Sequence, residues 1–117
     1  MYRVDAYQFE SSEVTSPGAV GVRIQWLIDE SRGAPNFALR RFVIEPGGST
    51  PHHTHNWEHE VYVLRGRGLL VTDGQQREIG PDMAILIEAN EPHQFCALPE
   101  GSLEFLCMVP NGPATAK

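Results

Sequence analysis

Basic residues are scarce in this chain, which has one lysine, Lys117, against eight arginines and a formal net charge of −6. A basic stripe able to neutralise a phosphate backbone is missing, which argues against nucleic-acid binding. The sequence also lacks any run near the roughly 18 apolar residues that a membrane span requires. Its N-terminus, MYRVDAYQFE, carries acids and no apolar segment typical of secretory signals. We therefore expect a cytoplasmic protein that does not bind membranes.

Cysteine is rare as well, with only Cys96 and Cys107. In a reducing compartment two such residues beside apolar stretches are expected to be free buried thiols. The intervening segment ALPEGSLEFL could nevertheless fold them together, so a disulfide stays an alternative. The length of 117 residues suffices for one core and predicts a single domain.

Helical periodicity is absent from every window longer than ten residues, whereas strand signals recur along the chain. Asp73-Gly74 is a strong hairpin signal between two of them. Short strands separated by turn residues predict an all-β barrel or sandwich. The irregular parts are residues 1–17, 29–35 and 111–117. The predicted strands cover 18–29, 36–45, 60–66, 68–73, 75–79, 83–88, 92–98 and 102–110.

Histidine is concentrated instead, since four of the five histidines fall in the eight residues 52–59. His53 and His55 are separated by one residue, so on a strand they project to one face and His52 to the other. His59 opens the strand HEVYVLRG and shares the parity of its valines, while His93 starts a later strand. An isolated histidine is usually a solvated surface group, but one cation could satisfy four converging imidazoles.

The spacing from Gly47 through His53, His55 and His59 to Gly66 resembles the first cupin motif, with His59 in place of the usual glutamate. The stretch PDMAILIEANEPHQF resembles the second motif, which makes His93 the last ligand. Asp82 stands where that family has glycine, and Ala89 where close relatives often have proline. The resemblance covers about residues 36–110 and is strongest to small four-histidine monocupins, some of which bind manganese. It implies a single-domain cupin double-stranded β-helix barrel.

The resemblance also implies one divalent transition metal ion per chain, held by His53, His55, His59 and His93 with two adjacent positions open. Manganese or iron is favoured, and nickel, copper, cobalt or zinc would also accept such donors. Glu60 has the opposite strand parity to His59, so we expect its side chain to face outward.

Strand parity further suggests a mainly apolar pocket for a small hydrophobic or aromatic substrate. Only one of Arg40 and Arg41 can face it; Arg40 in that position could hold a substrate carboxylate. The candidate pocket residues are Arg40, Trp57, Tyr62, Phe95, Phe105 and Cys107.

The leading functional hypothesis is an oxygenase-like metalloenzyme, by resemblance to cupin dioxygenases. A non-redox isomerase, cyclase or lyase, and a non-catalytic binding module, are the alternatives, because the fold hosts all three. We divide the chain into residues 1–35, the barrel 36–110 and a tail 111–117. Residues 1–30 are expected to support a homodimer through their apolar side chains, which are Tyr2, Val4, Tyr7, Phe9, Val20, Val22, Ile24 and Trp26.

Overall fold

The computed structural model describes residues 1–115, and strands supply nearly all of their regular structure. No helix in this part of the chain is long and apolar enough to cross a membrane. The helical turns are η1 Ala6–Gln8, η2 Glu30–Arg32 and η3 Pro113–Thr115. The strands are β1 Ser12–Glu13, β2 Val20–Ile28, β3 Phe37–Ser49, β4 His59–Arg65, β5 Gly68–Thr72, β6 Gln75–Ile79, β7 Ala84–Ile87, β8 Gln94–Ala97 and β9 Leu103–Pro110.

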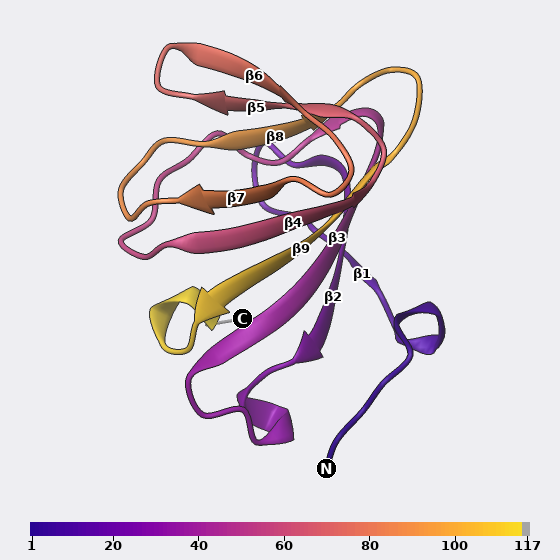
Figure 1. Ribbon diagram of the computed structural model, residues 1–117, viewed down its shortest axis with the longest axis vertical. Coiled ribbons are helices and arrows are strands. Elements are labelled where there is room, and N and C mark those ends of the chain that lie inside the picture. Colours follow the sequence, from indigo (N-terminus) through magenta and orange to yellow (C-terminus); the bar gives the residue numbers. More distant parts are fainter. Residues whose placement is uncertain (116–117) are drawn as a thin grey trace.

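The strands form one sheet that folds over on itself. They pair in the order β6-β5-β8-β3-β9-β4-β7, and β2 pairs with β3 outside this path. The long strand β3 joins the two parts of the folded sheet. It pairs with β9 from Phe37 to Ile44 and with β8 at Ser49. In Figure 1, β6, β5 and β8 lie above β4, β9, β3 and β2. This architecture confirms the all-β barrel predicted from the sequence.

Alternation of apolar and polar residues explains why these segments form strands with one face in the core. In β4, His59, Val61 and Val63 are buried, while Glu60 and Tyr62 are exposed. In β9 every second residue is buried, beginning with its first. The buried hydrophobic cluster comprises Val22, Ala38, Ile44, Val61, Val63, Leu70, Ile79, Ile87, Phe95, Ala97, Leu103, Phe105, Cys107 and Val109.

All eight predicted strands are present, with ends shifted by a few residues. The Asp73-Gly74 hairpin is confirmed, since Thr72 pairs with Gln75 across it and Gly74 has φ of +71°. The segments expected to be irregular contain the short elements β1, η1, η2 and η3, which are too brief to show a period. Residues 116 and 117 of the predicted tail lie outside the described residues.

Two turns have a left-handed backbone at positions that belong to the two cupin-like motifs, Gly66 and Asp82. Gly66 has φ of +85°, and a Cβ atom there would overlap the carbonyl oxygen of Ser102. Asp82, which stands where related motifs have glycine, has φ of +69°. Asp is one of the few residues that adopt this conformation at low cost. The substitution at position 82 therefore leaves the turn before β7 intact.

Strand β2 belongs to the barrel sheet, because it pairs with β3 from Val20 to Ile28. Three of the eight apolar residues expected to support a dimer, Val22, Ile24 and Trp26, line the internal cavity instead. Others, such as Tyr7 and Val20, are exposed. The homodimer and the division at residue 35 stay predictions.

Candidate metal centre

The connection between β3 and β4 carries the paired histidines. His53 lies outside any regular strand and forms an isolated antiparallel bridge with His93, with N–O distances of 3.1 and 3.0 Å. His53 and His55 therefore do not lie along one strand, because the chain makes only a single bridge there. Their side chains nonetheless share a side: His52 is exposed, whereas His53 and His55 are partly buried.

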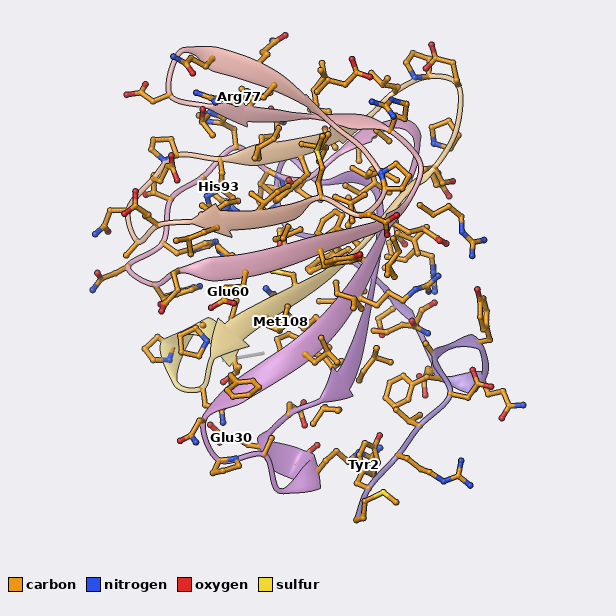
Figure 2. The ribbon with its side chains drawn as sticks, in the orientation of Figure 1. Tyr2, Glu30, Glu60, Arg77, His93 and Met108 are labelled. Carbon is orange, nitrogen blue, oxygen red and sulfur yellow. The ribbon has the colours of Figure 1, made fainter. Side chains whose placement is uncertain are left out.

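Three of the four predicted ligands bring their ring nitrogens together, and the ring of the fourth, His59, lies beside them. Ring nitrogens of His53, His55 and His93 all lie within 4.8 Å of one another. The Nε2 atoms of His53 and His55 are 3.1 Å apart. His59, the first residue of β4, has its ring centroid 5.3 Å from that of His55 and 4.9 Å from that of His93. His93 directly precedes β8 and is labelled in Figure 2.

The environment keeps these imidazoles neutral. Burial, together with the neighbouring histidines, lowers the pKa of His53 to about 4. Burial and the nearby Arg40 charge lower the pKa of His59 to about 3. Burial is also the main cause that lowers the pKa values of His55 and His93. At neutral pH each ring therefore has a free lone pair, the form that binds a metal ion.

Contacts of the Nδ1 atoms fix the orientation of two of the rings. His93 Nδ1 donates to the carbonyl oxygen of Glu91 at 2.9 Å, which leaves Nε2 as the free lone pair. His59 Nδ1 lies 3.4 Å from Cys107 Sγ, while its Nε2 atom is buried without a hydrogen-bond partner among residues 1–115. An orphaned buried nitrogen costs about 1–3 kcal/mol. A shared divalent transition metal ion would satisfy it, so these residues fit such an ion.

Carboxylates are not part of this histidine cluster within the described chain. Glu60 follows His59 directly but is exposed on the outer face of β4, as its strand parity predicts. Glu58 is exposed as well. The centre thus offers neutral nitrogen donors only, so a bound divalent ion would keep its full double charge.

A cavity of about 590 Å³ adjoins the cluster. Of the predicted pocket residues, Arg40, Trp57, Phe95, Phe105 and Cys107 all line it.

Tyr62 does not line this cavity, and its prediction as a pocket residue is wrong. It is 38 % exposed, and its hydroxyl donates to Asp82 Oδ1 at 2.9 Å on the outer surface. The reason is the two-residue period of β4: with His59 facing inward, Tyr62 must face outward.

Arg40 is the arginine that faces inward. It is 9 % exposed, and its Nη2 donates to Cys107 Sγ at 3.0 Å and lies 3.5 Å from His59 Nδ1. Arg41 projects to the other face of β3, where it donates to Glu104 and Gln25. Cys107 and Cys96 are both free thiols, as expected, but only Cys107 is buried, whereas Cys96 is half-buried.

Several residues that line the cavity were not predicted from the sequence. Phe42 stacks on Phe105 with ring centroids 5.3 Å apart, and Phe95 stacks on Phe105 at 4.6 Å. Phe42 shares the parity of Arg40, which could have identified it. Residues 12–16 and 113–114 also line the cavity, but only the folded chain brings these distant segments together.

The family model of the cupin domain matches residues 40–109. The chain belongs to the cupin family. This cupin is 41% identical to the polyketide cyclase RemF from Streptomyces resistomycificus, over 96% of this chain and 80% of that chain, with a TM-score of 0.92. It is 33% identical to a cupin 2 domain-containing protein from Halorhodospira halophila, over 94% of this chain and 75% of that one, with a TM-score of 0.74.

One curated relative is a 1-methylthio-D-xylulose 5-phosphate methylsulfurylase from Rhodospirillum rubrum. It is 35% identical over 71 residues, which are 61% of this chain and 46% of that protein. The cupin thus spans about half the length of this curated relative.

Proposed function

We propose that this cupin is a metal-dependent cyclase that closes a ring in a polyketide-like chain without redox chemistry. Its main support is the aromatic-walled cavity with four imidazoles at one end, in a chain that aligns over 96% of its length with a polyketide cyclase. Cavities of about 300–1,000 Å³ hold small organic ligands. The 590 Å³ available here suits a folded chain of that size.

His53, His55, His59 and His93 would hold the ion, whose identity stays a prediction with manganese or iron favoured. A bound divalent ion of this kind supplies Lewis-acid polarisation of a carbonyl oxygen. The protein's own contribution is to keep all four imidazoles neutral through burial and to fix the His93 ring with the Glu91 carbonyl. Because no carboxylate joins the cluster within the described chain, an anionic oxygen of the substrate meets no competing negative charge there.

The aromatic wall would impose the folded shape of the substrate. Phe42, Phe95 and Phe105 form a continuous stack on one side of the cavity, and Trp57 stacks on His55 with ring centroids 4.5 Å apart. Flat side chains at fixed distances bind planar enolised carbonyl groups and keep water away from them. They thereby bring two distant parts of one substrate chain close enough to react.

Ring closure needs no electron acceptor. A carbon atom between two carbonyl groups loses a proton and forms a bond with a carbonyl carbon further along the same chain. That carbonyl oxygen gains the proton and becomes a hydroxyl group. The hydroxyl group then leaves as water together with the second hydrogen of the attacking carbon, and a double bond forms between the two joined carbons. In balance, one C=O bond and two C–H bonds are replaced by one C=C bond and one released water molecule.

The oxygenase-like reaction expected from the sequence stays a prediction that uses the same cavity and the same imidazoles. Incubation of an aryl 1,3,5,7-tetraketone, in which C2 lies between two carbonyl groups and can close a six-membered ring at C7, with the zinc-loaded protein under anaerobic conditions separates the two. A cyclase accelerates formation of a product that has lost one water, measured by mass spectrometry, relative to metal-free protein. Dioxygen uptake by the manganese or iron form, with oxygen atoms in the product and an inactive zinc form, would show an oxygenase and overturn the proposal.

A further inference from the structure

We infer that Arg40 is a specificity residue, which binds an anionic oxygen of the substrate beside the histidine cluster. The inference deepens the proposed function and rests on it for the polyketide-like carbon skeleton. The preference for an anion rests only on Arg40 and its surroundings.

The charge of Arg40 has no counter-ion in the described structure. A guanidinium group remains protonated at any ordinary pH. The ion pairs among residues 1–115 involve Arg41, Arg65 and Arg67, and none involves Arg40. Burial of a charge without a partner is strongly unfavourable. Arg40 is 9 % exposed and lines the cavity, so a partner can reach it only from the cavity.

The neighbours of Arg40 hold the guanidinium in place but do not neutralise it. Cys107 Sγ is a neutral acceptor 3.0 Å from Nη2. The rings of Trp26 and Phe42 lie with their centroids 5.4 and 5.0 Å from Cζ. The Nε donor is buried without an acceptor among the described residues. Nη1 makes no hydrogen bond among the described residues, so its two N–H donors remain available to a ligand.

Arg41 provides an internal comparison, because it is the next residue of the same strand. Its Nη2 donates to Glu104 Oε1 at 2.9 Å, and its Nη1 donates to Gln25 Oε1 at 3.1 Å. The protein supplies a carboxylate for the arginine on the outer face and none for the arginine on the cavity face. A negatively charged oxygen of the substrate would form the missing ion pair with Arg40.

The shape of the guanidinium indicates the chemical class of ligand. Its planar fork of N–H groups matches two oxygen atoms in one plane, as in a carboxylate or an enolised 1,3-dicarbonyl anion. The adjoining wall of Trp26, Phe42 and Phe105 matches a flat hydrocarbon skeleton. The structure thus points to a planar aromatic or enolised substrate that carries a negative oxygen.

Isothermal titration with 2-naphthoate and its neutral analogue 2-naphthamide tests the inference directly. Metal-free protein is the main arm, so that a metal ion cannot bind the carboxylate in place of Arg40. We expect at least tenfold tighter binding of the naphthoate. Arg40→Met should reduce that ratio to about one with little change for the amide, whereas Arg41→Met should preserve it.

Arg40→Lys serves as a second variant if Arg40→Met does not fold. It keeps the charge without the planar fork, and we expect it to lower the ratio at least threefold. The same ratio in wild type and in either folded Arg40 variant would overturn the inference. Wild-type protein that binds neither probe, or binds both equally, would also overturn it. Because the assay measures binding, a protein without cyclase activity can pass it and an active cyclase can fail it.

Discussion

The two halves of the histidine cluster are built differently. The loop half, His53 and His55, lies in the connection before β4 and is partly exposed. The strand half, His59 and His93, adjoins β4 and β8 and is 7 and 4 % exposed. Each Nδ1 of the strand half faces an outer partner: the Glu91 carbonyl for His93 and Cys107 Sγ for His59. In the loop half, the two Nε2 atoms face each other at 3.1 Å.

This difference shows which part of the site the fold organises in advance. The strand half is oriented by packed strands and by hydrogen bonds on the far side of each ring, the arrangement that positions metal-binding histidines. The loop half is attached through its backbone, where Asn90 N donates to His55 O at 2.6 Å. The hydrogen-bond roles of the two Nε2 atoms depend on the tautomers of the rings. Since packed strands do not hold these two rings, we expect the loop half to readjust when an ion binds.

Removal of a strand-half ligand should have the largest effect. We expect His59→Ala to lower metal affinity more than the roughly 100-fold that outer partners contribute. His55→Ala should lower it less, because the loop half is the more adaptable one. Metal content by mass spectrometry on protein without a histidine tag, and competition with a chelator, give both values.

Glu60→Ala is the matched control for this pair, since Glu60 is the next residue and faces outward. It should retain full metal content. Equal losses in Glu60→Ala and His59→Ala would show that the assigned register of β4 is wrong.

Removal of the metal ion should have the next largest effect, in this case on the stability of the folded protein. An ion present at a hundred times its dissociation constant stabilises the folded state by about 2.7 kcal/mol, so its removal should lower the free energy of unfolding by that amount. Hydrogen exchange should rise mainly in the loop half and its flanking residues, with little change in β4. A uniform rise across the barrel would contradict the proposed division into two halves.

The outer partner of His59 should contribute less than the ligand itself. We expect Cys107→Ala to lower metal affinity about 10–100-fold, in the range found for residues that orient a metal ligand. Cys107→Ser, which keeps an acceptor, should recover part of this loss. Cys96→Ala is the control, because Cys96 is a free thiol outside the cavity. Equal metal affinities of the two alanine variants would contradict a positioning role of Cys107.

The smallest effect is expected at Tyr62. Its hydroxyl bonds Asp82 on the exposed outer face of β4, so Tyr62→Phe removes one solvent-exposed hydrogen bond. Metal affinity and naphthoate binding should remain unchanged in titrations of this variant. A marked loss of either would place Tyr62 in the site after all.

Sequence patterns predicted the strands because most of them alternate, as β4 and β9 do, or follow a clear turn signal, as β6 follows Asp73-Gly74. The spacing of a known motif led to the four histidines. The two-residue period of β4 also excludes Tyr62 from the pocket if His59 faces inward. The prediction of Tyr62 as a pocket residue did not take this into account. Other features were not predictable from local patterns. The wall formed by residues 12–16 and 113–114 depends on segments about 100 residues apart in the chain, which only the closed barrel juxtaposes.

The backbone bridge between His53 and His93 has a consequence for the order of assembly. It joins residues that are 40 positions apart, so it is a long-range contact that costs loop-closure entropy. The chain has no complete set of donors before that contact forms. The four-donor set is therefore a property of the folded chain, and the histidine-rich connection alone offers only part of it.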